Sequence, residues 1–252
     1  MTDKPQDFAG KVAIITGATR GIGFGIAEEL IGRGGRVVIT ARKPDELTEA
    51  TDRLGGPTRA LAARGSADDA EHQAATVEQA IAAFGRLDLL VNNAAINPLY
   101  GQVIDADLGA VRKTFDVNIT ATLAWTQLAW RAWMQEHGGS VLNVASVGGI
   151  RSGAPIGIYN TSKAALIHLT RVLAGELAPK VRVNAIAPAV IKTKFARALY
   201  ESDEEGVASA YPMKRLGVPE DCATAAAFLL SDAASWVTGE CIVIDGGITT
   251  IH

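Results

Sequence analysis

The chain has 252 residues, of which 48% are hydrophobic and 20% are charged, and its formal net charge at pH 7 is −3. This length is sufficient for the core of one α/β domain, and the slightly negative charge argues against a nucleic-acid partner. The chain has only two cysteines, Cys222 and Cys241, and no uncharged run of membrane-spanning length, which favours a cytoplasmic protein with free thiols and no membrane partner.

Short apolar runs alternate with helical patterns along the whole chain. The apolar runs have the composition of buried strands and lie at residues 11–16, 36–40, 58–63, 87–91, 140–144, 181–187 and 241–244. Helical spacing follows residue 23, recurs at 45–54, 68–84, 105–136 and 219–230, and starts again near residue 159. This alternation predicts an α/β protein with one doubly wound, Rossmann-like parallel sheet and helices on both faces. Because no linker or repeat divides the chain, we expect residues 1–252 to form a single domain.

Residues 189–217 depart from this alternation. Helical signals are weak there, and charges of both signs are mixed. Ligands of an open α/β sheet bind outside the carboxyl ends of its strands, so an insertion after the sixth strand would lie at the mouth of the site. We therefore expect residues 189–217 to form a lid over the substrate.

A glycine-rich loop joins the first predicted strand to the first predicted helix. Its sequence is Thr16-Gly17-Ala18-Thr19-Arg20-Gly21-Ile22-Gly23. Glycines between a strand and a helix let the backbone approach a pyrophosphate at the helix N-terminus, although they would also suit a plain tight turn. The strand before the loop and the helix after it favour dinucleotide binding.

Tyr159 and Lys163 lie four residues apart at the start of a predicted helix and therefore share one of its faces. An ammonium group near a phenol favours the phenolate, so we expect Lys163 to lower the pKa of Tyr159. Such a phenol can act as a general acid or base near neutral pH. Taken alone, the pair would also suit an ordinary helix surface.

Further motifs follow in a recognisable order. Asn92-Asn93-Ala94-Ala95 comes after the fourth strand, Asn118 lies in the long helix, and Ser146 follows the fifth strand. Together with the glycine loop, Tyr159 and Lys163, they resemble the motifs of the short-chain dehydrogenase/reductase family, over about residues 10–248. The resemblance implies an oxidoreductase that moves hydride between a nicotinamide and a carbonyl or secondary alcohol.

Catalytic roles are implied by this resemblance for four residues. Tyr159 would exchange a proton with the substrate oxygen, and Ser146 would hydrogen-bond that oxygen. Lys163 would tune Tyr159 and bind the nicotinamide ribose. Asn118 would hold a water that relays protons to Lys163.

The resemblance also implies cofactor contacts from Tyr159, Lys163 and residues around the loops. These further positions are Gly17, Thr19, Arg20, Gly21, Ile22, Gly23, Ser66, Asn92, Ala94, Pro188, Ile191 and Thr193. Two positions depart from the family pattern. Ala189 follows Pro188 where glycine is usual, and Gly65-Ser66 stand where an aspartate often binds the adenine, so we expect adenine to be held by Ser66 and the backbone.

Charge predicts which nicotinamide is used. Dinucleotide folds that take NAD usually carry an acid at the end of the second strand, whereas this chain has Ala41 followed by Arg42 and Lys43. Arg20 lies within the glycine loop. Arg20 and Arg42 would favour a 2′-phosphate, because guanidinium groups bind phosphate oxygens in a planar fork, while Lys43 also suits a solvated turn. We therefore predict NADP(H).

The sequence leaves the substrate open between two classes. The expected substrate wall is mostly apolar and comprises Ile150, Ala154, Pro155, Ile156, Phe195, Leu199, Tyr200 and Tyr211. Basic residues such as Arg151 and Lys192 lie nearby. This combination suits a 3-oxoacyl thioester on an anionic carrier or a bulky ketone. Three segments look somewhat closer to those of NADPH-dependent carbonyl reductases, namely residues 93–98, 191–193 and 216–222.

The family resemblance implies a homotetramer, in which residues 236–247 form one of the interfaces. The four histidines have no metal-ligand spacing, so no metal is expected. Two alternative functions remain open. One is an NAD(H)-dependent alcohol dehydrogenase of the same family, and the other is a non-catalytic nucleotide-binding protein, which would be expected to lack Tyr159 or Lys163.

Overall fold

The computed structural model describes residues 5–153 and 155–251, and within them seven strands form one parallel sheet in the order β3-β2-β1-β4-β5-β6-β7. The strands are β1 Val12–Ile15, β2 Arg36–Ala41, β3 Ala60–Arg64, β4 Leu89–Asn92, β5 Gly139–Val144, β6 Val181–Pro188 and β7 Cys241–Ile244. The doubly wound fold predicted from the alternation is confirmed. The strand order reverses beside β1, which pairs with both β2 and β4. Ligand sites of such sheets lie at this reversal.

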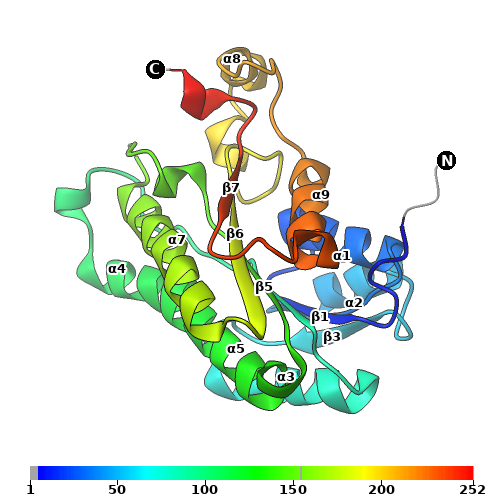
Figure 1. Cartoon of the computed structure of the whole chain (residues 1–252). Helices are drawn as coiled ribbons and strands as arrows, with labels where there is room; N and C mark the ends of the chain where they lie inside the picture. Colours follow the sequence, from blue (N-terminus) through cyan, green and yellow to red (C-terminus); the bar gives the residue numbers. More distant parts are fainter. Residues whose placement is uncertain (1–4, 154, 252) are drawn as a thin grey trace.

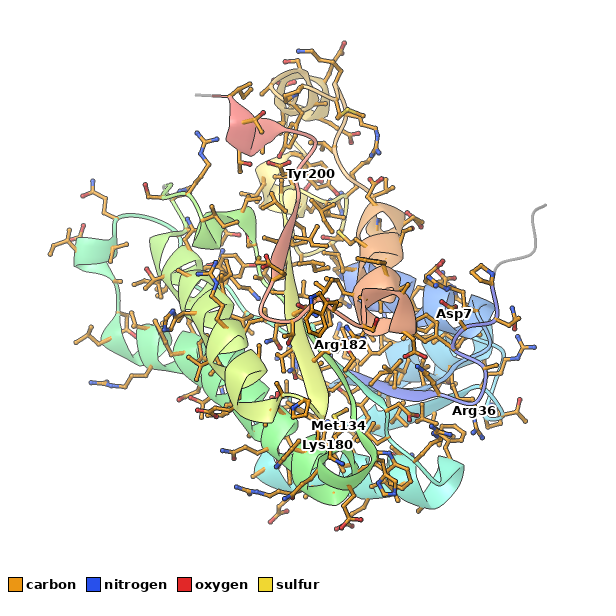
Figure 2. All side chains as sticks on the ribbon, viewed as in Figure 1. Asp7, Arg36, Met134, Lys180, Arg182 and Tyr200 are labelled. Carbon is orange, nitrogen blue, oxygen red and sulfur yellow. The ribbon has the colours of Figure 1, made fainter. Side chains whose placement is uncertain are left out.

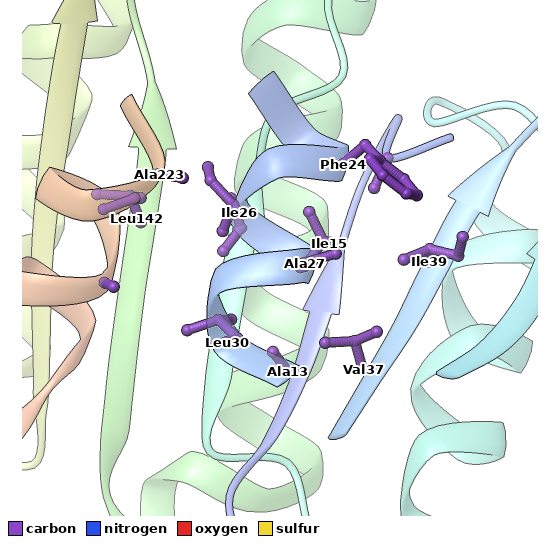
Figure 3. Packing of buried hydrophobic residues seen from close by; sticks show 14 of the residues in the cluster. Ala13, Ile15, Phe24, Ile26, Ala27, Leu30, Val37, Ile39, Leu142 and Ala223 are labelled. Atoms are coloured by element: carbon purple, nitrogen blue, oxygen red, sulfur yellow. The ribbon is translucent and has the colours of Figure 1, made fainter. Parts of the chain in front are cut away.

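Strand residues alternate between two apolar layers, because successive side chains of a strand point to opposite faces. In β1, Ala13 and Ile15 pack on one face, and Ile14 packs on the other. Helices α1 Gly21–Gly32, α2 Pro44–Arg53 and α9 Pro219–Leu230 cover the first face, whereas α3 Ala70–Phe84, α5 Ala121–Ala129 and α7 Gly157–Leu177 cover the second (Figure 1). Figure 3 shows Ala27 and Leu30 of α1 packed over the sheet. Each large apolar side chain buried this way contributes about 1.5–3 kcal/mol.

Both ends of α9 are satisfied by neighbouring groups. At its start, Pro219 occupies the first turn, and the Asp221 carboxylate accepts a hydrogen bond from the Val218 amide at 2.8 Å. At its end, Arg182 of β6 donates to the carbonyl oxygens of Leu229 at 2.6 Å and Ser231 at 2.9 Å (Figure 2). The last carbonyls of a helix have no partner within the helix, so this arginine fixes α9 to the sheet.

The long helix expected over residues 105–136 is not one regular helix. It consists of α4 Leu108–Phe115, a π-helical turn Asp116–Thr120, α5, a second π-helical turn Trp130–Met134 and α6 Gln135–His137. A π-helical turn inserts one residue into the helical repeat, so it shifts the face that the following residues present. Hydrophobic periodicity does not reveal such an insertion. The first of these turns contains Asn118.

Residues 189–217 stand above the carboxyl end of β6 (Figure 1) and contain more helix than their sequence indicates. A 3₁₀ turn covers Arg197–Leu199, and α8 spans Glu204–Ser209. The side chain of Asp203 accepts a hydrogen bond from the Gly206 amide at 2.8 Å and so caps α8. An ion pair of 2.7 Å between Lys192 and Glu204 joins α8 to the segment that follows β6. None of the helices in the described ranges is both long and apolar enough to cross a membrane.

Candidate active site

A cavity of about 640 Å³ opens at the carboxyl ends of the strands, beside the reversal of strand order. Most of the residues assigned from the sequence line it. These are Gly17, Thr19, Arg20, Gly21, Ile22, Arg42, Ser66, Ala94, Ser146, Tyr159, Lys163, Pro188, Ile191 and Thr193. Three assigned residues lie behind its wall instead, namely Gly23, Asn92 and Asn118. The fold therefore brings the glycine loop and the Tyr159 helix to one cavity.

The glycine loop has a conformation that other residues would not adopt without strain. Gly17 and Gly21 have left-handed φ angles of 63° and 59°. A Cβ atom on Gly23 would lie 2.5 Å from the side-chain nitrogen of Asn93. That nitrogen donates to the carbonyl oxygens of Thr16 at 2.8 Å and Gly17 at 2.9 Å. The loop is thus closed against the chain after β4 and leads into the N-terminus of α1, which fits a pyrophosphate.

Asn92 and Thr16 support the cavity from below. The Asn92 side chain donates to Asn143 of β5 at 2.9 Å and to Thr126 of α5 at 3.3 Å. Its position indicates that it fixes β4 to its neighbours rather than touching a ligand. The Thr16 hydroxyl accepts hydrogen bonds from the backbone amides of Asn93 and Ala94, both at 3.0 Å. Thr16 was not assigned a role from the sequence, because a threonine at a strand end has no distinctive signal.

An acid lies on the cavity wall where the sequence led us to expect only cations. Glu46 in the first turn of α2 forms an ion pair of 2.5 Å with Arg20 and one of 3.1 Å with Lys43. The hydrogen bond from Lys43 and the nearby Arg20 charge hold the pKa of the Glu46 carboxyl below its usual value. Acids are common in the first turn of any helix, so the sequence did not distinguish Glu46 as a site residue.

The missing aspartate after β3 has a steric explanation. A Cβ atom on Gly65 would lie 2.1 Å from Cγ of the His72 ring. That ring packs edge-on against Trp125, with ring centroids 5.7 Å apart. No side chain therefore fits at residue 65. A carboxylate is still present on this wall, because Asp68 lines the cavity and accepts a hydrogen bond from Ser66 at 2.5 Å.

Tyr159 and Lys163 share one face of α7, as their spacing predicts, and both are buried. The Lys163 ammonium nitrogen lies 5.5 Å from the centre of the Tyr159 ring and donates to the Val144 carbonyl at 2.7 Å. The Ser146 side chain hydrogen-bonds the Tyr159 phenol. Ser146 also accepts the Gly148 amide at 3.1 Å, which fixes its rotamer. These three side chains form one polar cluster in the cavity.

The expected effect of Lys163 on Tyr159 is wrong for the protein without ligands. Burial raises the pKa of the Tyr159 phenol above its ordinary value, although the Ser146 hydrogen bond opposes this. Burial also lowers the pKa of Lys163 to about 7. Both shifts have the same cause, since a site shielded from water disfavours each charged form. The Lys163 group faces the Tyr159 ring and a carbonyl, and its charge is only partly present at neutral pH.

Asn118 does not line the cavity, and its side chain is held by neighbouring groups. Its Oδ1 accepts a hydrogen bond from the Ile96 amide at 2.9 Å. Its Nδ2 donates to the Ile96 carbonyl at 3.1 Å and to the Ser162 hydroxyl at 2.9 Å. Both amide hydrogens are therefore used within the protein. These contacts do not test the expectation that Asn118 holds a water which relays protons to Lys163, and it stays a prediction. Its position in a π-helical turn makes it a positioning residue between the chain after β4 and α7.

The remaining cavity wall is mostly apolar. Of the residues expected there, Ile156, Phe195, Leu199 and Tyr211 line the cavity, whereas Ile150, Pro155 and Tyr200 do not. Ala154 lies outside the described residues. The sequence did not indicate Tyr100, Ile248 or Thr249, which line the cavity as well. Arg151 holds the C-terminal segment in place, because its guanidinium donates to the carbonyls of Ile248 at 2.7 Å and Ile251 at 3.3 Å.

Among the described residues, no group of three or more His, Cys, Asp or Glu side chains is placed to hold a metal ion. The residues present do fit a dinucleotide. Positive-φ glycines, a helix N-terminus and cationic side chains line one end of the cavity, and the polar cluster lies at the other.

Comparison with known proteins agrees with this geometry. A family model described as enoyl-(acyl carrier protein) reductase matches residues 17–249. Dehydrogenase/reductase SDR family member 4 from Homo sapiens is 40% identical over 246 residues, which cover 95% of this chain and 87% of that protein. The protein of the same name from Caenorhabditis elegans is 39% identical over 256 residues, which cover 98% of each chain.

Solved structures have the same fold. A short-chain dehydrogenase/reductase from Brucella melitensis, titled glucose/ribitol dehydrogenase, gives a TM-score of 0.92 at 32% identity and covers 97% of this chain and 99% of its own. Thermoplasma acidophilum aldohexose dehydrogenase gives 0.89 at 29% identity, with 99% and 98% covered. The chain therefore belongs to the short-chain dehydrogenase/reductase family of oxidoreductases, whose members use a nicotinamide coenzyme.

Proposed function

We propose that this protein is an NADP(H)-dependent oxidoreductase that transfers hydride reversibly between the nicotinamide and a carbonyl or secondary alcohol. The observation that carries the proposal is the shared cavity, which the glycine loop lines at one end and Ser146, Tyr159 and Lys163 line at the other. Such an arrangement would hold a dinucleotide with its reactive end beside a proton donor.

The nucleotide would be held largely by backbone groups. Gly17, Gly21 and Ile22 line the pyrophosphate end of the cavity, where the first amides of α1 are available to an anion. Arg20 and Arg42 would bind the 2′-phosphate. On the opposite wall, Pro188 and Thr193 would flank the nicotinamide. Ala189 follows Pro188 in this wall, so the loop tolerates a methyl group where the family usually has glycine.

The bound coenzyme would supply or accept the hydride. Ser146 would donate a hydrogen bond to the substrate oxygen and hold it next to the Tyr159 hydroxyl. The Tyr159 phenol carries its proton at neutral pH and could donate it to a carbonyl oxygen, although burial raises its pKa and so makes it a weaker acid until a positive charge lies beside it. Lys163 would stabilise the resulting phenolate whenever its amine is charged.

The substrate would be a small carbonyl compound with an apolar body, or a 3-oxoacyl thioester. Phe195 packs near Tyr159, with ring centroids 5.9 Å apart, and Phe195, Leu199 and Tyr100 provide an apolar surface in front of the phenol. Residues 189–217 would act as a lid over this surface. Arg151 at the cavity rim would suit an anionic carrier, which keeps the thioester as the second substrate class.

We propose that the protein acts in the cytoplasm as a homotetramer, without a nucleic-acid or membrane partner. Trp236 is 99% exposed, and Phe228 of α9 and Val243 of β7 are 41% and 39% exposed. Apolar side chains gathered on α9, β7 and the turn between them suit an interface between copies. Light scattering that gives the mass of a monomer would contradict this part of the proposal.

The test is a substrate panel assayed with NADPH and with NADH. Aromatic ketones, diketones, quinones, retinal and acetoacetyl thioesters are each supplied, and oxidation of the coenzyme is followed. We expect turnover of at least one carbonyl, with NADPH preferred over NADH. Preference for NADH would favour the alternative of an NAD(H)-dependent alcohol dehydrogenase. Nucleotide binding without turnover of any carbonyl or alcohol would favour the non-catalytic alternative.

A further inference from the structure

The cationic end of the cavity contains a carboxylate that uses both of its oxygens within the protein. Glu46 Oε2 accepts hydrogen bonds from Arg20 Nη1 at 2.5 Å and from the Thr19 hydroxyl at 3.4 Å. Its other oxygen, Oε1, accepts from Lys43 Nζ at 3.1 Å. All four side chains line the cavity. The carboxylate therefore occupies one donor each of Arg20, Lys43 and Thr19 that a phosphate group could otherwise use.

Arg42 differs from its cationic neighbours. It lines the same wall, yet it forms no ion pair with any residue of the described ranges. Glu46 is 30% exposed at its side chain, whereas Arg20 and Lys43 are 51% and 66% exposed, so the carboxylate is the least exposed of the three charged groups. Arg20 and Lys43 thus share the single negative charge of Glu46, whereas Arg42 has no such partner within the described ranges.

A 2′-phosphate and the Glu46 carboxylate would compete for the same donors. A phosphate monoester carries about −1.5 to −2 charges at pH 7, so it would also be repelled by a carboxylate that stays beside it. A ribose hydroxyl behaves in the opposite way, because it can donate a hydrogen bond to a carboxylate. The presence of Glu46 therefore weakens binding of a 2′-phosphate and is compatible with binding of a 2′-hydroxyl.

We propose that Glu46 sets the coenzyme selectivity of this protein, by holding Arg20 and Lys43 in ion pairs that a 2′-phosphate must break. This inference rests on the proposed NADP(H) dependence and deepens it. Selectivity for NADP(H) then comes from Arg42, and from Arg20 to the extent that the 2′-phosphate displaces its guanidinium from Glu46. Because this displacement costs free energy, Glu46 keeps the preference for NADP(H) over NAD(H) modest. Glu46 acts here as a positioning and competing residue and takes no part in the chemical step.

The experiment measures binding without turnover. Adenosine 2′,5′-bisphosphate and 5′-AMP, which differ in the 2′-phosphate, are titrated calorimetrically into the wild-type protein, Glu46→Gln and Glu49→Gln. Glu49 lies on the same helix, is exposed and does not line the cavity, so it is the matched control. We expect Glu46→Gln to bind the bisphosphate about fivefold more tightly, as loss of one exposed competing ion pair implies. Its affinity for 5′-AMP should stay within about twofold, and Glu49→Gln should match the wild type for both ligands.

A second comparison tests whether Glu46 acts through Arg20. In an Arg20→Ala background, adding Glu46→Gln should give a smaller gain in bisphosphate affinity than in the wild type, because Arg20 can no longer be released while Lys43 and the charge repulsion remain. Unchanged or weaker bisphosphate binding by Glu46→Gln would overturn the inference. So would an increase in bisphosphate affinity that is as large in the Arg20→Ala background as in the wild type. The ratio of the dissociation constants of the two ligands in the wild-type protein tests the proposed NADP(H) dependence separately. The inference about Glu46 concerns only how bisphosphate affinity changes from wild type to variant.

Discussion

The side-chain amide of Asn118 donates a hydrogen bond to the buried Ser162 hydroxyl at 2.9 Å. Ser162 in turn donates to the Tyr159 carbonyl at 2.7 Å. The π-helical turn is thereby joined to the turn of α7 that carries Tyr159 and Lys163. The placement of the phenol thus depends on a contact between two helices as well as on α7 itself.

Replacing Ser162 by alanine removes this connection. The Asn118 amide loses an acceptor in a buried site, so we expect the free energy of unfolding to fall by about 1–3 kcal/mol. Turnover should fall while coenzyme affinity is kept, because Ser162 is outside the cavity wall. Urea unfolding and steady-state kinetics measure the two effects. Thr161→Ala is the control, since that exposed hydroxyl bonds only within α7, to the Gly157 carbonyl. Wild-type stability in Ser162→Ala would contradict the prediction.

Removing the Tyr159 hydroxyl should abolish most of the proposed acid/base catalysis. We expect Tyr159→Phe to lower kcat by about 10²- to 10⁴-fold, the range typical of a positioned proton donor. Coenzyme binding, followed by calorimetry, should remain close to wild type because the ring is retained. Tyr200→Phe is a matched control, since its hydroxyl donates to the Thr193 carbonyl away from the cluster. A Tyr159→Phe protein with normal turnover would disprove the assigned role.

The stability of the protein should depend on pH through Lys163. The pKa of this amine is about 7 in the folded protein and 10.5 when it is unperturbed. Between these values the unfolded chain binds a proton that the folded protein does not, so the free energy of unfolding rises with pH. Below about pH 7 both states are protonated, and the full cost of burying the charge is present.

Lys163→Met tests this dependence. The free energy of unfolding of the variant relative to wild type should fall by roughly 2–3 kcal/mol between about pH 6.5 and about pH 9. The reason is that Lys163 of the folded wild type loses its proton over this range, so the wild type no longer has to bury a charge. The variant also loses the hydrogen bond that Lys163 donates to the Val144 carbonyl. This loss lowers its stability by the same amount at every pH, so it does not alter the pH dependence of the difference. Measurements stay below pH 10, because the raised pKa of Tyr159 acts in the opposite direction above it. A difference that is constant with pH would refute the assignment.

A side chain at residue 65 should collide with His72. Gly65→Ala would bring its Cβ within 2.1 Å of the ring, so we expect a loss of about 1–3 kcal/mol in the free energy of unfolding. The same substitution in a His72→Ala background should cost much less, because the ring is gone. Urea unfolding of the four proteins gives the coupling between the sites. Equal costs in both backgrounds would show that the ring is not what excludes a side chain.

The sequence predicted the sheet, its helices and most of the cavity wall, because these features follow from local patterns. Buried strands are continuous apolar runs, and the glycine loop combines strand, turn and helix signals in one stretch. The position of Asn118 did not follow, since a π-helical turn leaves no trace in apolar periodicity. Glu46 and the contact between Gly65 and His72 depend on the distance between separate elements. Their side chains have ordinary local explanations, so only the folded chain reveals what they do.

The hydrogen bonds from Arg151 to the C-terminal segment have a practical consequence. Ile248 and Thr249 are part of the cavity wall, and the guanidinium of Arg151 holds the carbonyls of Ile248 and Ile251. The C-terminal end of the described chain therefore lies next to the substrate opening, where a tag would obstruct it. The N-terminal end of the described chain lies on the other side of the molecule, near α1 and α2 (Figure 1). Tags at that end leave the opening free, and kinetic measurements should use them.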